Sequence, residues 1–314
     1  MEFLYSHVKI TKEGGDNINI LSDLYRRASQ SAAATISVAC ADDVNIMAAI
    51  EAARDIAKFI LIGNMNNIRK TADSAKVDIS DCVIVDEPDT TIACQIATQL
   101  VSTGKAQALM KGKVDTSVIM KAVLDKEIGM RTGRKLSHLA VFELVTYHKL
   151  LFISDAAINI SPEISVKQEI IHNAVESVLA LGINNPKVAL LAAKEKIDQK
   201  MPVTMDIAEL IENHKAKKSP LDNKFTMAGP LALDNAICKE SCDLKGIDSP
   251  IRGDADILVC PDIEAGNILY KALAFLAGGK GGGVVLGAKR PIIMTSRADS
   301  AESKLISIAL GILS

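Results

Sequence analysis

The sequence lacks the features that would point to a nucleic-acid or membrane partner. It contains no tryptophan, aromatic residues make up 3% of it, and its formal net charge is −2. Without stacking platforms or an overall positive field, nucleic acid is not an expected partner. No apolar run approaches the roughly 18 residues of a membrane span, and the N-terminus carries no signal-peptide pattern. We therefore expect a cytoplasmic protein that does not associate with a membrane.

Cysteine is also sparse. There are six, and most lie in apolar runs, where a thiol behaves as a small hydrophobic group. Cys238 and Cys242 are four positions apart, so a metal site or a disulfide has to be considered. His214 is the only histidine within thirty residues of this pair, and a metal would need further ligands nearby. Reduced thiols are therefore favoured, as in a cytoplasmic protein, and we expect no metal.

The 314 residues, 48% of them hydrophobic, suffice for a large core built from alternating strands and helices. Continuous apolar strands separated by helices predict an α/β fold with a parallel sheet covered on both faces. In the first part of the chain the pattern predicts strands at 33–39, 58–62, 82–85 and 106–110, and helices at 43–57, 68–75, 90–102 and 116–124.

A second series of elements begins near His138. Strands at 139–146 and 150–154 are joined by a short turn, and a helix capped by Ser161 runs to Gly182. The alternation continues at 188–192, 205–212, 257–260, 264–277, 284–286 and 292–295, with a closing helix at 300–313. The polar segment 131–135 separates the two series. We therefore predict two three-layer α/β domains with a cleft between them.

The most informative stretch for chemistry lies near the C-terminus. A strand ends at Asp262 and Glu264, a glycine-rich segment covers 278–283, and Ser296-Arg297 opens the last helix. Free N–H groups at a helix start attract an anion, and an arginine adds a bidentate fork for phosphate. Plainer interpretations exist for each part. Ser296 and Asp299 fit a helix cap, and Ser300 caps equally well. Asp262 and Glu264 favour the positive end of a helix, and the glycines suit a flexible turn.

Four ordered motifs resemble the phosphate acetyl/butyryltransferases, and the butyryl branch in particular. The longest is Pro-Asp-Ile-Glu-Ala-Gly-Asn-Ile-Leu-Tyr-Lys at 261–271, followed by a glycine-rich segment and the Ser296-Arg297 pair. The others are Asp-Ala-Ala-Ile-Asn-Ile-Ser-Pro at 155–162 and Gly-Pro-Leu-Ala-Leu-Asp-Asn-Ala at 229–236.

The resemblance implies the reaction acyl-CoA + phosphate ⇌ acyl phosphate + CoA, with butyryl-CoA favoured. Coenzyme A and phosphate are then substrates, and no cofactor is implied. The family fold is similar to that of isocitrate and isopropylmalate dehydrogenases, with the active site in the interdomain cleft and usually a homodimer. In that arrangement residues 1–137 and 291–314 form the first domain and residues 138–290 the second.

The chemistry requires a base for the CoA thiol, whose ordinary pKa is about 8.5. The resemblance places an aspartate seven positions after Ser296, but this sequence has Ser303 there. We expect Glu302, or else Asp299, to take the proton. Arg297 would neutralise phosphoryl charge, and Ser296 would donate a hydrogen bond to a carbonyl or phosphoryl oxygen.

The expected substrate-binding residues come from the family motifs and from two basic segments, at 111–116 and 131–134. They are Lys113, Thr116, Arg131, Arg134, Asp155, Asn159, Asp262, Glu264 and Asn267. For the two basic segments, the alternative is an ordinary basic loop exposed to solvent. Two other functions stay open. One is an acetyl-specific transferase. The other is a non-catalytic acyl-CoA-binding or regulatory module, suggested by the serine at 303. A dehydrogenase of the shared fold lacks convincing metal and nicotinamide motifs.

Overall fold

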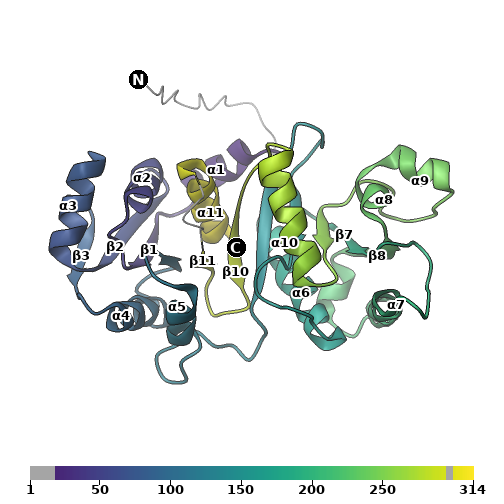
Figure 1. Ribbon diagram of the computed structural model, residues 1–314, viewed down its shortest axis with the longest axis horizontal. Helices are drawn as coiled ribbons and strands as arrows, with labels where there is room; N and C mark the ends of the chain where they lie inside the picture. Colours follow the sequence, from purple (N-terminus) through teal and green to yellow (C-terminus); the bar gives the residue numbers. More distant parts are fainter. Residues whose placement is uncertain (1–17, 295–299) are drawn as a thin grey trace.

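Eleven strands form one continuous mixed sheet in the computed structural model, which describes residues 18–294 and 300–314 (Figure 1). The strands are β1 (Ala34–Ala39), β2 (Ala57–Gly63), β3 (Val83–Asp86), β4 (Ala108–Lys111), β5 (Ser137–Glu143), β6 (Leu151–Ser154), β7 (Lys187–Leu191), β8 (Thr226–Leu231), β9 (Ile257–Val259), β10 (Lys280–Leu286) and β11 (Ile292–Ile293). Their order across the sheet is β3-β2-β1-β4-β11-β10-β5-β6-β9-β7-β8.

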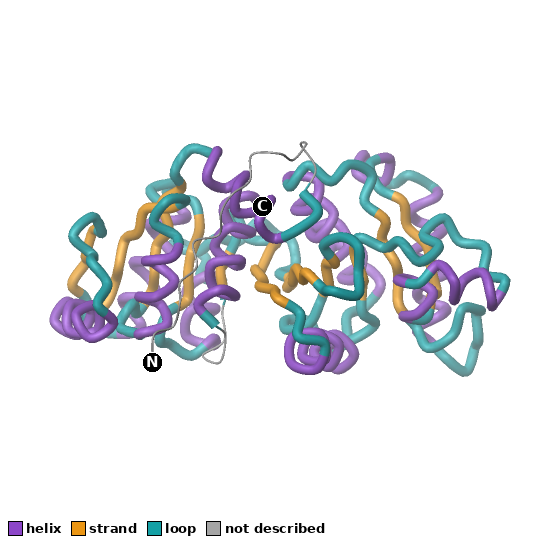
Figure 2. Tube along the Cα trace, turned by 90° about the horizontal axis from the view of Figure 1, so that it is seen from above, coloured by secondary structure: helices purple, strands orange, loops and turns teal. Residues whose placement is uncertain are grey.

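Helices cover both faces of this sheet, as the view from above in Figure 2 shows. They are α1 (Leu21–Gln30), α2 (Val44–Ala52), α3 (Met65–Ala75), α4 (Thr90–Ser102), α5 (Thr116–Val123), α6 (Ile164–Ala180), α7 (Pro202–Lys215), α8 (Leu233–Ile237), α9 (Lys239–Lys245), α10 (Ile263–Lys271) and α11 (Ala301–Leu313). One apolar cluster joins α1, α2, α3, α6, α7 and α11 on one face. Two smaller clusters hold α4 and α5, and α8, α9 and α10, on the other. The predicted α/β class with both faces covered is confirmed.

The strand directions correct the prediction of a parallel sheet. Strands pair in parallel within each half, but β10 runs antiparallel to both β11 and β5, and β5 runs antiparallel to β6. The reason is the length of the connections. A parallel crossover needs a dozen or more residues, whereas residues 287–291 and 144–150 are short links that can only join antiparallel neighbours.

The C-terminal segment returns to the N-terminal half of the sheet. In β11, Ile292 pairs with Leu109 and Ile293 with Met110 of β4, while α11 packs against α1, α2 and β10. Figure 1 shows β11 and α11 in the middle of the molecule, between β1 and α10. The division into two domains with the boundaries given above stays a prediction.

Several predicted element ends were wrong. The helix expected over 43–57 ends at Ala52, because the chain turns there and enters β2 at Ala57. The strand expected over 139–146 is β5, which begins and ends earlier, at Ser137 and Glu143. The helix expected from Ser161 begins only at Ile164, so Ser161 does not cap it.

Two further differences concern the C-terminal half. The expected helix at 264–277 is α10 followed by a π-helical turn, η2 (Ala272–Leu276). Strand β8 had no prediction, because its Gly-Pro sequence does not resemble a strand. Among the described residues, no helix is both long and apolar enough to cross a bilayer.

Candidate active site

The glycine-rich segment lies at the centre of the sheet, and it is a strand rather than the loop or turn considered above. Lys280, Gly281, Gly282 and Gly283 open β10 and pair with β5. Close packing explains the glycines. A Cβ on Gly283 would lie 2.6 Å from the ring nitrogen Nε2 of His138, so no larger residue fits without displacing the ring.

On the opposite face of β10, Gly282 packs against α11. A Cβ on Gly282 would lie 2.6 Å from Ser307 Oγ and 2.7 Å from the carbonyl oxygen of Ser303. The N–H of Gly283 donates to Ser307 Oγ at 2.9 Å. The glycines therefore let α11 approach the sheet, which places the beginning of that helix beside the beginning of β10.

Glu302, the candidate base that lies within the described residues, is at the beginning of α11. Ser300 caps the helix by accepting a hydrogen bond from the N–H of Ser303, so the Ser300 alternative is confirmed. Glu302 lies in the first turn, and its Oε1 accepts a hydrogen bond of 2.9 Å from Lys280 Nζ. Both side chains are largely exposed, 54% and 60% respectively. The hydrogen bond and charge of Glu302 raise the pKa of Lys280.

Three other predicted catalytic residues, Ser296, Arg297 and Asp299, lie outside the described residues. They immediately precede Ser300 and Glu302 in the sequence.

A pocket of about 260 Å³ opens beside Glu302. Apolar and aromatic groups come from β5, α10 and the π-helical turn, and polar groups come from α11 and β10. Its lining consists of Phe142, Tyr270, Ala274, Phe275, Gly279, Lys280, Gly281, Ser300, Glu302 and Ser303.

The motif at 155–162 forms a tight turn around Asp155, which is only 3% exposed. Its Oδ1 accepts hydrogen bonds from the N–H groups of Ala157 and Ile158, at 2.9 and 3.0 Å. Its Oδ2 accepts from the N–H and the side-chain amide of Asn159, at 3.2 and 2.6 Å. The carboxylate is therefore occupied in shaping the turn.

The motif at 261–271 packs directly on this turn. Asp262 caps α10 by accepting from the N–H of Ala265 at 2.8 Å, so its carboxylate lies at the positive end of the helix, as the plainer interpretation expected. Asn267 Nδ2 donates to the carbonyl oxygen of Ala156 at 3.1 Å. A Cβ on Gly266 would collide with the carbonyl oxygen of Asp155.

The structure thus brings Asp155, Asn159, Asp262 and Asn267 into one packed unit, whereas Glu264 is exposed beside it.

The predicted basic residues are spread over two loops. Lys113 follows β4 and is exposed, with its Nζ 4.0 Å from a carboxylate oxygen of Asp42. Thr116 is the first, exposed residue of α5. In the loop before β5, Arg131 is exposed, and the Nη1 atom of Arg134 lies 2.6 Å from Glu176.

Sequence reasoning passed over two residues beside these positions. Lys111 is buried at the end of β4, and its Nζ donates to the carbonyl oxygens of Gly112 and Val114. His138 is buried in β5, with its ring edge-on to Tyr270 at 5.9 Å between centroids. Lys111 belongs to the Lys-Gly-Lys segment, which was a usable signal; the position of His138 had no motif.

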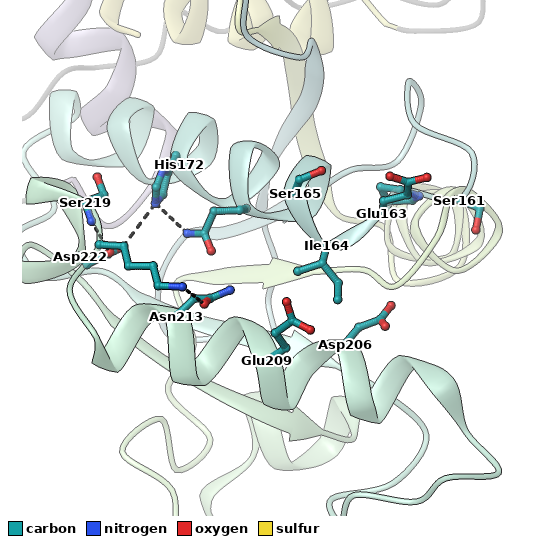
Figure 3. A pocket seen from close by; sticks show the side chains of 13 residues that line it. Ser161, Glu163, Ile164, Ser165, His172, Asp206, Glu209, Asn213, Ser219 and Asp222 are labelled. Carbon is teal, nitrogen blue, oxygen red and sulfur yellow. Dashed lines mark hydrogen bonds and ion pairs between the residues drawn. The ribbon is translucent and has the colours of Figure 1, made fainter.

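A larger pocket, of about 920 Å³, lies elsewhere, between α6 and α7 (Figure 3). His172 projects into it from α6, and Asp222 lies at one end. Gln168 also lines it and is hydrogen-bonded to Nε2 of His172. Glu163, Asp206, Glu209 and Asp222 also line it. These four carboxylates outnumber the one lysine of the lining, Lys218, and this disfavours a phosphate or a CoA pyrophosphate because like charges repel. We take the pocket of about 260 Å³ beside Glu302 as the candidate active site, because its lining combines the candidate base and Ser300 with apolar side chains.

Within residues 18–294 and 300–314, no group of three or more histidine, cysteine, aspartate or glutamate side chains is arranged to hold a metal ion. The six cysteines are free. Burial raises the pKa of Cys260, next to the motif at 261–271, to about 12.

Comparison with known proteins identifies the family. The sequence matches the phosphate acetyl/butaryl transferase family over residues 87–312. It is 42% identical to a phosphate butyryltransferase of Clostridium acetobutylicum over 88% of this chain and 92% of that protein. The chain belongs to this family.

Further relatives show how wide the family similarity is. A phosphate acetyltransferase of Rhizobium meliloti is 39% identical over 91% of this chain and 90% of its own. The crystal structure of a branched-chain phosphotransacylase from Enterococcus faecalis is 33% identical, with a TM-score of 0.79 over 89% of this chain and 98% of that one. Identity to butyryl and acetyl enzymes is therefore nearly equal, and overall similarity does not separate the two chain lengths.

Proposed function

We propose that this protein transfers a short acyl group between coenzyme A and inorganic phosphate, with butyryl or a related branched chain as the acyl group. The observation that carries the proposed reaction is the 42% identity to the Clostridium acetobutylicum phosphate butyryltransferase over most of both chains. The preference for butyryl rests on the motif resemblance and is tested by the substrate series below. The branched-chain phosphotransacylase supports the same reaction and a substrate longer than acetyl. The Rhizobium meliloti phosphate acetyltransferase makes acetyl transfer the second candidate.

In the proposed mechanism Glu302 accepts the proton of the CoA thiol. The thiolate attacks the carbonyl carbon of the acyl phosphate, the C–S bond forms, and the C–O bond to phosphate breaks with its electron pair leaving on phosphate. Ser296 and Arg297, which precede α11 in the sequence, hold the phosphoryl group, and the positive end of α11 adds favourable potential. Asp299 is the alternative base.

Lys280 contributes by positioning the base. Its Nζ is hydrogen-bonded to Oε1 of Glu302, which leaves Oε2 as the oxygen that takes the proton. Asp155, Asn159, Asp262 and Asn267 form a packed unit outside the lining of the pocket beside Glu302, and they are proposed to shape the part of the substrate site beyond it. Glu264, Lys113, Thr116, Arg131 and Arg134 are proposed to contact the substrates from exposed positions.

The first experiment measures phosphate-dependent release of free thiol from a series of acyl-CoA substrates. We expect release that requires phosphate and is faster with butyryl-CoA than with acetyl-CoA. Faster release from acetyl-CoA would make the protein a phosphate acetyltransferase. No phosphate-dependent release from any short acyl-CoA would leave the acyl-CoA-binding module as the function.

The second experiment identifies the base. Glu302→Gln should lower kcat by about 100-fold or more, because general base catalysis contributes roughly 10²- to 10⁴-fold. Asp299→Asn is measured in parallel. Glu212→Gln is the matched control, since Glu212 is exposed and bonded to Lys215 at the same 2.9 Å, far from the site in the sequence. If neither variant loses tenfold in rate, the carboxylate base is refuted.

The finer architecture is also proposed. A cleft between residues 1–137 with 291–314 and residues 138–290, similar to that of isocitrate dehydrogenase, would let the two walls of the site close on the substrates. The pairing of β11 with β4 supports this division. Free cysteines support a cytoplasmic location. A homodimer is proposed from the resemblance to the family, and light scattering would test it.

A further inference from the structure

The pocket beside Glu302 has two chemically different walls. Ser300 and Glu302 form the polar side, at the start of α11, where the thiol chemistry is proposed. Phe142, Tyr270, Ala274 and Phe275 form the apolar side. An acyl-CoA has the same division, because its polar thioester carbonyl is attached to an apolar acyl chain.

We infer that this pocket receives the acyl chain, and that Ala274 and Phe275 determine which chain lengths fit. The inference rests on the proposed function, since it assigns the substrate's apolar part to a place in the same site. It makes the π-helical turn a specificity element.

The inner part of the apolar wall is rigid. Phe142 is fully buried in β5, and its ring meets the ring of Tyr270 edge-on, with 5.1 Å between centroids. A Cβ on Gly281 would lie 2.6 Å from Cδ1 of Phe142, so the strand and the ring are in close contact. This wall is therefore formed before any ligand arrives, and the chain meets a surface of fixed shape.

The outer part of the apolar wall is formed by the π-helical turn. π-Helical turns are rare and frequently occur at functional sites, and this one follows directly on the end of α10. Here it carries Ala274 and Phe275 into the lining of the pocket. Ala274 is small and leaves room. Phe275 is 69% exposed, so contact with an acyl chain would remove apolar surface from water on both partners.

The size of the effect follows from the number of carbons. Butyryl has two methylenes more than acetyl, and complete burial of two methylenes corresponds to about a 15-fold gain in kcat/KM. A residue that fills the pocket should remove this gain while leaving the two-carbon acetyl group undisturbed.

The test compares acyl-CoA substrates of different length with the full chain. Ala274→Leu should lower kcat/KM for butyryl-CoA at least tenfold and change that for acetyl-CoA less than twofold. Phe275→Ala should lower the butyryl-to-acetyl ratio about threefold to fivefold. Because Phe275 is exposed, this second variant tests the pocket without a risk to folding. Leu276→Ala is the control, since Leu276 is adjacent, 87% exposed and outside the lining.

Binding measured by calorimetry separates this inference from the proposed reaction. Wild-type protein should bind butyryl-CoA about tenfold more tightly than acetyl-CoA, and Ala274→Leu should abolish the difference. This result supports the pocket even if no turnover is detected, in which case only the proposed reaction fails. An unchanged butyryl-to-acetyl ratio in both variants overturns the inference. An equal loss for all acyl-CoA substrates also overturns it, because the pocket would then hold a part of CoA that they share.

Discussion

Replacing Asp155 with alanine should disrupt the turn through which the motif at 155–162 contacts the motif at 261–271. The change removes the acceptor of four hydrogen bonds, from Ala157, Ile158 and, twice, Asn159. A hydrogen bond to a charged group contributes about 1.5–3 kcal/mol, and the four are not additive because they share one carboxylate. We expect the free energy of unfolding to fall by about 3–4 kcal/mol.

The loss should reach activity as well as stability. The backbone of Asp155 and Ala156 supports α10 through its contacts with Gly266 and Asn267. A turn without its carboxylate no longer holds the start of that helix. We therefore expect kcat/KM to fall at least tenfold in the same variant, measured by phosphate-dependent thiol release.

Urea unfolding measures the stability change, and two further variants make the result specific. Asp155→Asn keeps one acceptor oxygen and should show an intermediate loss. Asp125→Ala is the matched control: Asp125 accepts from the N–H groups of Glu127 and Ile128 in the same kind of turn, but at the surface, where water replaces it. The reasoning is refuted if Asp155→Ala lies within about 1 kcal/mol of wild type or is no worse than Asp125→Ala.

Two other residues carry predictions of a different kind. Gly282→Ala should cost about 1–3 kcal/mol in a urea titration and lower kcat, because its Cβ pushes Ser307 and the rest of α11 from the sheet; unchanged values would contradict that packing. Burial opposes ionisation of Asp254, but hydrogen bonds from Lys149 and Lys187 outweigh it and hold the pKa of this carboxyl well below its ordinary value. A lowered folded-state pKa stabilises the protein above the unfolded pKa, about 3.9, and this contribution is lost as the pH falls further. Asp254→Asn should therefore be less stable than wild type at pH 7, and the difference should shrink progressively as the pH falls below about 4. A difference independent of pH would argue against the ion pairs.

The alternation of strands and helices was predictable because burial has a short-range signature. Strands covered by helices on both faces need continuous apolar runs, and the run at 106–110 and the helix at 90–102 follow this rule closely. Helix caps are local as well. Ser300 and Asp262 cap the helices that follow them through hydrogen bonds to residues three positions away.

The contacts between distant segments were beyond local pattern. β11 pairs with β4 across more than 180 positions, and its backbone hydrogen bonds would be the same for any pair of strands. Taken alone, the glycines at 281–283 are typical of a turn. They form a strand because Phe142, Ser307 and His138 pack so closely against them that no larger side chain would fit.

For function, the chain alone determined the family chemistry, because motifs of eight to eleven residues preserve the order of reactive side chains. Tertiary structure decided which groups meet. Lys280 is hydrogen-bonded to Glu302, and the buried carboxylate of Asp155 accepts hydrogen bonds from its own turn. Ala274 and Phe275 line the same pocket as the candidate base. These relations depend on how α10 and α11 pack across the sheet, and packing arises from the sum of many weak contacts between residues far apart in the chain.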